Sequence, residues 1–486
     1  MERASYPTRS RRSTLVRLNP SAENRAIVPA LLAVGAASCA HAVWLAGANP
    51  GIPEGDAAHY RALALEMLAL AHRAEWASVL SLTTTVVPNP GVLSAWLALV
   101  QGIFGSGERV CVAAWLPFHL ILAVGLWRGG QAVGGRAAGV FAVATGLFSP
   151  VVVHAARSSL FDFPLVACVG FVAGNLLNRR MRWAGVGAGL ALWTRLAAGP
   201  MLAVPMLDAL REASWRGRAT LFLVPAAFFL ALYPWHAADL WAYSHAGGNV
   251  PTALQGGAGV AGRAAIYLRA CFVVVQPPVL LGLVAALLSG GSLRLLAWAV
   301  GMVLALLPLT VNPQARYLLP LVPVLTLGVA SMGARWSRVL PLLSLATLGQ
   351  TLAYDLDVSG AIVGAPTWLR TPPATPDFPI DASLDWLSAH SGVEGAPAAV
   401  VVDVQDWPGI SFAALRYRAL ERGLSLRFIA VDGSRLPPDA SLGVVIRRSA
   451  REPGPNEFVR LLTPTATLDA PDGFTVELYD YEMMGD

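Results

Sequence analysis

The sequence AIVPALLAVGAASCAHAVWLAGANPGIPEGDAAHY (26–60) decides the fold class, because a long apolar run leads directly into a polar helix start. A helix needs about 20 apolar residues to cross a bilayer, and residues 26–48 are long enough to do so. The run is too long for the apolar core of a signal peptide. Residues 1–25 carry arginines but few acids, so the positive-inside rule predicts a cytoplasmic, arginine-rich N-terminus. The chain after residue 48 is then expected outside the cytoplasm.

The composition of the whole chain agrees with a polytopic membrane protein. Of its 486 residues, 55% are hydrophobic and 13% are charged, whereas soluble domains carry about 25% charged residues. The net charge of +5 is spread over the loops, which argues against nucleic-acid binding. All basic residues are arginine, so chemistry through a lysine Schiff base is excluded. The four cysteines lie in apolar segments, and their spacing suits neither a zinc site nor a disulfide framework.

The hydropathy pattern predicts about eleven transmembrane helices within residues 26–354. Residues 183–207 are predicted to form two short helices hinged at Trp193, Thr194 and Arg195, because one crossing would place the next arginines outside. Residues 265–288 are predicted to form one continuous helix. The bundle is expected to carry an outer catalytic loop at about residues 49–107, in which residues 91–105 lie along the membrane surface.

Beyond residue 354 the composition changes. Residues 355–379 form a proline-rich linker, which cannot sustain a helix. Strand-like runs follow at 398–404, 426–432, 442–448 and 475–482, with a helix-like segment at 411–423. Residues 380–486 are therefore predicted to be a small α/β domain on the extracytoplasmic side.

The first candidate site segment is the helix predicted at 57–72. Asp56, His59 and Tyr60 share one face at its start, above an apolar stripe. An ionisable side chain against a membrane is expensive, which makes it a functional candidate. The alternative is that Asp56 serves as an N-cap and that His59 and Tyr60 are solvated.

Two other outer segments carry charged residues. HAARSSLFD (154–162) places His154, Arg157 and Asp162 between two helix ends, and Asp162 could instead be an N-cap with Pro164 in the first turn. NPQARY (312–317) ends in Arg316 and Tyr317, which suit a phosphate. The alternative for this second pair is an arginine and a tyrosine that anchor at the membrane interface.

Arg195 and Arg269 differ from these residues because apolar neighbours surround each of them. An arginine within a span should face a polar cavity rather than lipid. Two acids among several arginines describe a pocket in which a carboxylate acts as general base or holds a divalent metal beside a phosphate. The arginines can neutralise a phosphate leaving group.

The order of these motifs resembles the GT-C membrane glycosyltransferases. The branch it is most similar to is the dolichyl-phosphate-mannose-protein mannosyltransferase-like family, which includes the aminoarabinose transferases of lipid A. The matching pieces are GDAAHYRALALEML (55–68), IFGSGERV (103–110), HAARSSLFDFPLVA (154–167), GLALWTRLAAGP (189–200), YPWH (233–236) and ARYLLPLVPVL (315–325).

The resemblance implies a GT-C-type bundle in a bacterial inner or plasma membrane. The expected activity is inverting transfer of a sugar from a polyprenyl-phosphate donor to a lipid, glycan or protein acceptor of the cell envelope. It implies that Asp56 and Asp162 are catalytic, with Asp56 as the principal acid or base. His59, Tyr60, His154, Arg157, Arg195, Arg269, Arg316 and Tyr317 are then candidates for substrate binding. A divalent metal ion, if one is used, would bind Asp56 and Asp162.

The chain departs from the family pattern at two places. Ala57 stands where many members have a second acid, and PNPGVL (88–93) replaces a lysine-containing patch. These changes bear on metal use and on the acceptor, and they are compatible with a weakened or inactive member. A transporter or flippase of lipid-linked intermediates and an inert membrane scaffold are the alternatives. A transporter would favour charges at mid-membrane and internal repeats, whereas the charges here gather at the predicted outer helix ends.

Overall fold

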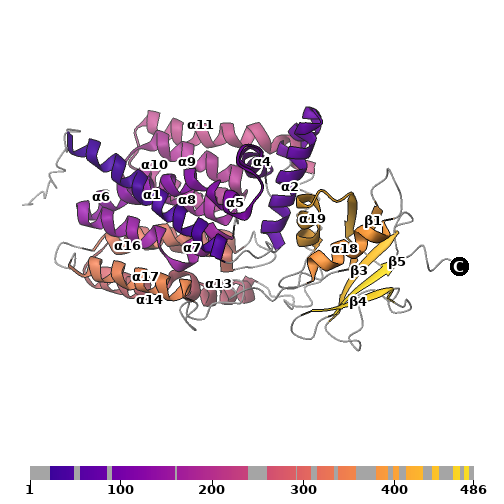
Figure 1. Ribbon diagram of the computed structural model, residues 1–486. Coiled ribbons are helices and arrows are strands. Elements are labelled where there is room, and N and C mark those ends of the chain that lie inside the picture. The colour runs from indigo at the N-terminus through magenta and orange to yellow at the C-terminus, as the bar shows by residue number, and fades with distance from the viewer. Residues whose placement is uncertain are drawn as a thin grey trace, which may run out of the picture.

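The protein is described by a computed structural model in which a helical bundle lies beside a smaller α/β domain (Figure 1). For Gly55 and Asp56 the description covers the backbone alone. The described residues are 22–48, 55–84, 90–158, 161–238, 260–291, 293–307, 315–332, 338–356, 379–391, 398–403, 412–430, 441–447, 464–470 and 475–480.

Apolar helices build the bundle, and the first helix begins four residues before the predicted start. Several helices are short and meet at breaks within the bundle. In chain order the helices are α1 (Ala22–Ala48), α2 (Gly55–His72), α3 (Trp76–Thr84), α4 (Val92–Phe104), α5 (Glu108–Ala113), α6 (Leu116–Leu147), α7 (Pro150–Arg157), α8 (Asp162–Leu177), α9 (Met181–Thr194), α10 (Ala198–Leu210), α11 (Trp215–Leu232), η1 (Pro234–His236), α13 (Val260–Val275), α14 (Pro277–Leu288), α15 (Leu293–Leu306), η2 (Ala315–Leu318), α16 (Leu321–Ala330) and α17 (Leu340–Asp355).

Helix α6 is a hairpin of two helices that meet at Gly135. This glycine has φ 80° and ψ −162°, a backbone conformation that interrupts the helix and that glycine adopts without a steric penalty. A Cβ added to Gly146 would lie 2.5 Å from the Leu126 side chain, although 20 residues of straight helix span about 30 Å. The chain therefore turns back at Gly135.

Two glycines allow α6 and α8 to pack closely. A Cβ on Gly174 of α8 would lie 1.9 Å from the carbonyl oxygen of Gly125 on α6, so neither backbone could keep its place with a larger residue. Small residues let helices in membranes gain van der Waals contact between backbones. This packing fixes the position of α8, whose first residue is Asp162.

The bundle contains two helix breaks, one that the sequence predicted and one that it did not. The chain leaves helical geometry at Arg195, between α9 and α10, where the hinge was predicted. The prediction of one continuous helix over 265–288 is wrong, because α13 and α14 meet at Gln276 with a bend of 98°. The physical reason is the pair Pro277 and Pro278, since proline removes a backbone donor and disfavours helical geometry in the residue before it.

By length and hydropathy, several stretches of the described chain can cross a membrane. They are Ile27–Ala48, Glu108–Leu147 and Trp215–His236, with the bent pair Ala261–Val275 and Pro277–Leu288 as a broken span. Shorter apolar helices such as α8, α10, α15 and α16 pack among them. The chain therefore has the helices of an integral membrane protein, and about eleven crossings remain the predicted number.

The C-terminal region forms a mixed sheet with strand order β2-β1-β3-β5-β4. Strand β1 is parallel to β2 and β3, whereas β5 is antiparallel to β3 and β4. Side chains from the sheet, α18 and α19 share one apolar cluster. The elements are α18 (Ile380–His390), β1 (Ala398–Asp403), α19 (Phe412–Glu421), β2 (Leu426–Ala430), β3 (Leu442–Arg447), β4 (Ala466–Asp469) and β5 (Thr475–Asp480).

Candidate functional site

A buried acid faces two arginines at the start of α8. Asp162 has 1% of its surface exposed. Its Oδ1 lies 3.3 Å from Nη2 of Arg195, and its Oδ2 lies 4.0 Å from Nη1 of Arg316. The three side chains come from positions far apart in sequence, so the fold assembles them.

Tyr317 lies between the two arginines. Its ring centroid is 5.2 Å from the guanidinium carbon of Arg195 and 5.7 Å from that of Arg316. Both distances allow attraction between the cation and the face of the ring. The ring therefore helps to hold the two guanidinium groups near each other beside the Asp162 carboxylate. Asp162, Arg195, Arg316 and Tyr317 are called the Asp162 cluster below.

Local breaks in helix geometry place the members of the Asp162 cluster. Asp162 is the first residue of α8, and Arg195 is the extended residue that ends α9, with φ −156° and ψ 138°. Arg316 and Tyr317 belong to the short 3-10 turn η2, which packs against α13. Irregular backbone at membrane depth is tolerated where protein buries it or a polar cavity borders it.

The structure distinguishes between the two interpretations of Asp162. The N-cap of α8 is Phe161, and no side chain caps this helix end. The Asp162 carboxylate faces Arg195 and Arg316 instead. Nη2 of Arg195 donates a hydrogen bond of 3.5 Å to Oδ2, whereas Oδ1 makes an ionic contact with the same nitrogen and accepts no hydrogen bond from the described residues. Asp162 is therefore a buried acid with an available acceptor atom rather than a cap.

Helix α2 reaches the Asp162 cluster through two stacked aromatic rings. Tyr60, which is 2% exposed, stacks on Phe161 with ring centroids 3.7 Å apart and planes 7° apart. Phe161 immediately precedes Asp162. His59 is half-buried and meets Tyr60 edge to face. The predicted outer helix thus lies against the predicted outer loop.

Asp56 lies in the first turn of α2, one residue after the helix begins at Gly55. The predicted helix, with Asp56 as its N-cap and Ala57 as its first residue, begins two residues later than this start, within the usual uncertainty of helix ends. Its side chain lies outside the described residues.

The other predicted site residues have separate surroundings. His154 is buried, and its Nδ1 lies 2.9 Å from the hydroxyl of Tyr354 on α17. Arg157 is buried on α7, and its Nη1 has no hydrogen-bond partner among the described residues. Arg269 lies exposed on α13, outside the Asp162 cluster.

The described side chains do not fit a divalent metal ion at Asp162. Such ions require several oxygen ligands, and no three His, Cys, Asp or Glu side chains of the described residues converge to offer them. The two guanidinium groups that face Asp162 would also repel a cation.

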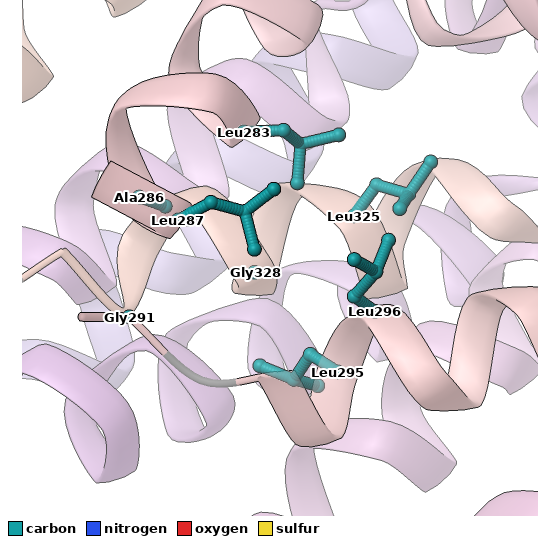
Figure 2. A pocket seen from close by; sticks show the side chains of 8 residues that line it. All are labelled: Leu283, Ala286, Leu287, Gly291, Leu295, Leu296, Leu325 and Gly328. Atoms are coloured by element: carbon teal, nitrogen blue, oxygen red, sulfur yellow. The ribbon is translucent and has the colours of Figure 1, made fainter. Parts of the chain in front are cut away.

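An apolar pocket lies elsewhere, between α14, α15 and α16. The side chains of Leu287, Leu296 and Leu325 border it, as Figure 2 shows. Its lining carries no charged side chain, so it offers nothing that would recognise a sugar or a phosphate.

Sequence reasoning missed a charged pair that joins α2 to α5. Arg61 is 1% exposed, and its Nη2 lies 3.5 Å from Oε1 of Glu108 on α5. One sign was present in the sequence, since Arg61 stands among Ala57, Ala58 and Ala62 on a helix start with small side chains. The partner could not be inferred, because 46 residues separate it from Arg61 along the chain.

Comparison with solved structures shows the fold. The chain is similar to ArnT from Cupriavidus metallidurans in the apo state, with a TM-score of 0.56 and 14% identity over 94% of this chain and 98% of that chain. It is also similar to the same protein bound to undecaprenyl phosphate, with a TM-score of 0.55, 13% identity and the same coverage.

No protein-family model matches the sequence, and no curated protein sequence matches it. The likeness to ArnT nevertheless spans both the bundle and the α/β region. The predicted ArnT-like GT-C fold is therefore confirmed.

Proposed function

We propose that this chain with the ArnT fold is a membrane glycosyltransferase. It takes a sugar from a polyprenyl-phosphate donor and transfers it, with inversion, to an acceptor at the extracytoplasmic face. The observation that carries the proposal is the buried carboxylate of Asp162 with Arg195 and Arg316 facing it.

The charge of the Asp162 cluster supports a phosphate ligand. Arg195 is buried and Arg316 is half-buried, and electrostatic interactions in such a place are stronger than in water. Arginine forms paired hydrogen bonds with phosphate oxygens. One of the similar structures is ArnT bound to undecaprenyl phosphate, which supports a polyprenyl carrier.

The proposed reaction is a single displacement at the anomeric carbon of the donor sugar. An acceptor hydroxyl oxygen forms the new bond to that carbon while the bond from the carbon to the phosphate oxygen breaks. Asp56, in the first turn of α2, takes the proton from the acceptor hydroxyl. Arg195 and Arg316 neutralise the polyprenyl phosphate that leaves. Asp162 accepts a hydrogen bond from a substrate hydroxyl through Oδ1 and keeps the two arginines in place.

The other predicted residues take supporting roles in this proposal. Tyr60 and His59 border the acceptor side, since Tyr60 stacks on the residue before Asp162. Arg157 supplies further positive charge beside the α7–α8 connection. The acceptor is a lipid, a glycan or a protein, and the C-terminal domain lies near it through its contact with α2.

The test is transfer from a polyprenyl-phosphate-linked sugar by the purified chain in proteoliposomes. Asp56→Asn is expected to abolish transfer without unfolding the protein, because the amide cannot take the acceptor proton. Asp385→Asn, in an exposed position on α18, is the matched control and should transfer as the wild type does. Full activity of Asp56→Asn would disprove the assignment of the base.

The same proteoliposomes separate the enzyme from a transporter. A transferase produces a glycosylated acceptor and free polyprenyl phosphate. Movement of the lipid-linked sugar between the leaflets, with no transfer in the wild type, would overturn the proposed function.

A further inference from the structure

Helix α2 contributes to three apolar clusters that belong to different parts of the molecule. Tyr60 belongs to the main core of the bundle. Ala58 and Ala62 belong to the core of the C-terminal domain. Ala64 and Met67 belong to a cluster with α4 and α5. Figure 1 shows α2 standing between the bundle and α19 of the C-terminal domain. Movement of this helix would therefore disturb all three clusters.

A buried ionic contact lies where these parts meet. The guanidinium of Arg61 faces Glu108 of α5 at 3.5 Å and lies 5.9 Å from the ring centroid of Tyr417 on α19. Arg61 is 1% exposed. A second pair, Arg416 of α19 with Glu66 of α2, forms at the more exposed edge of the same interface. One arginine thus joins the helix that carries Asp56 to both of its neighbours.

Burial of the ion pair between Arg61 and Glu108 costs desolvation free energy, so a gain in stability does not explain why it is there. Removing two charges from water costs several kcal/mol for each ion, and replacement of buried ion pairs by apolar residues is often neutral or stabilising. An alanine-rich helix such as α2 could slide or rotate on apolar neighbours alone. An ion pair favours the register in which its two charges lie closest, because the attraction weakens as they move apart.

The register of α2 matters because Asp56 and Tyr60 lie close to Arg61 on the same helix. Asp56 is five residues earlier, about 7.5 Å along the helix axis. Tyr60, the preceding residue, stacks on Phe161 beside Asp162. A rotation or shift of α2 would move the first turn relative to the Asp162 cluster.

We propose that Arg61 is a positioning residue, and that the docked C-terminal domain is a working part of the site through it. Arg61 holds α2 in the register that presents Asp56 to the substrate, with Glu108 on the bundle side and Tyr417 on the domain side. This inference rests on the proposed function for its effect on the reaction, whereas the effect on α2 itself is independent of that function.

The test compares Arg61→Met and Arg61→Lys with the wild type in the full-length chain. Hydrogen exchange is followed in peptides from α2 and α19, and transfer from a polyprenyl-phosphate-linked sugar is measured at varied donor concentration. Arg422→Met removes an exposed arginine immediately after α19 that pairs with Asp381 and Asp385 on α18, and it is the matched control. Tyr417→Leu examines the same contact from the domain side.

For Arg61→Met we expect faster exchange in the first turns of α2 and in α19. The kcat should fall by about tenfold or more, because small misplacements of reacting groups cost up to about 100-fold. The KM for the donor should stay within about twofold, because the arginines that hold the phosphate are untouched. Arg61→Lys should restore part of the kcat, and Arg422→Met should match the wild type.

Two results would overturn the inference. One is unchanged exchange in α2 for both Arg61→Met and Tyr417→Leu. The other is an unchanged kcat in Arg61→Met while α2 exchanges faster. A wild-type chain that transfers no sugar would disprove the proposed function, and the exchange measurement would still decide whether Arg61 holds α2.

Discussion

Two groups of acids and arginines lie at opposite ends of α8, and they are built differently. At the start of α8, buried Asp162 faces Arg195 and Arg316 at 3.3 and 4.0 Å. Beyond the end of α8, Arg179 pairs with Glu212, and Arg294 pairs with both Glu212 and Asp208. The second group is more exposed, with 67% of the Arg179 side chain open to solvent. Its two acids balance its two arginines.

The exposed group connects helices through ion pairs, whereas the Asp162 cluster is the proposed ligand site. Asp208 also accepts a hydrogen bond of 2.8 Å from the indole of Trp298, so its carboxylate has both an ionic partner and a hydrogen-bond donor within the protein. Asp162 is 1% exposed and faces both Arg195 and Arg316, and its Oδ1 accepts no hydrogen bond within the described part of the chain. An ionisable group buried within a membrane protein is a candidate for function.

The largest difference in transfer rate is expected when Asp162 and Asp208 are each replaced by asparagine. Asp162→Asn is expected to lower transfer from a polyprenyl-phosphate-linked sugar by about 100-fold or more, because it removes the negative charge that keeps the two arginines in place. Asp208→Asn should leave the rate within about twofold. Equal loss in both variants, at equal amounts of folded protein, would show that the two groups are equivalent.

A smaller effect is expected from the arginine of the paired group. Arg294→Met should lower the stability of the chain by about 1 kcal/mol, because partly exposed ion pairs contribute little. The measurement is thermal unfolding in detergent, with the transfer rate followed in parallel. A fall in the transfer rate that exceeds the loss of folded protein would place Arg294 in the reaction and contradict the contrast.

The smallest effect concerns an exposed pair of the C-terminal domain. Two hydrogen bonds of 2.9 Å from Arg418 lower the pKa of Asp381. A lowered pKa in the folded state stabilises the domain above the unfolded pKa of about 3.9, and this contribution is lost as the pH falls through the folded value. Wild type and Asp381→Asn should therefore differ slightly in thermal unfolding at pH 6, and the difference should shrink as the pH falls below about 3.9. A difference that grows toward pH 3 would contradict this sign.

The fold was predictable where local patterns determine it. The break at Arg195 follows from the distribution of arginines, and the strands β1, β2, β3 and β5 lie where apolar alternation predicts strands. The bend at Gln276 was missed, although Pro277 and Pro278 indicate it, because the apolar run continues through them.

The Asp162 cluster was predictable as separate residues but not as a set. Asp162, Arg195, Arg316 and Tyr317 each stand out as polar residues at helix ends within apolar sequence. Their meeting depends on the packing of α8, α9 and η2, and on the close approach that Gly125 and Gly174 allow. The contact of Arg61 with Glu108 and Tyr417 joins three distant segments, which no local pattern encodes.

Binding of undecaprenyl phosphate tests the central claim most directly, because it needs neither the sugar nor the acceptor. The double variant Arg195→Met, Arg316→Met should raise the Kd by about 100-fold, since it removes both cations from a buried anion site. Arg294→Met should keep the wild-type Kd. An unchanged Kd in the folded double variant would contradict the account of the Asp162 cluster as the phosphate site.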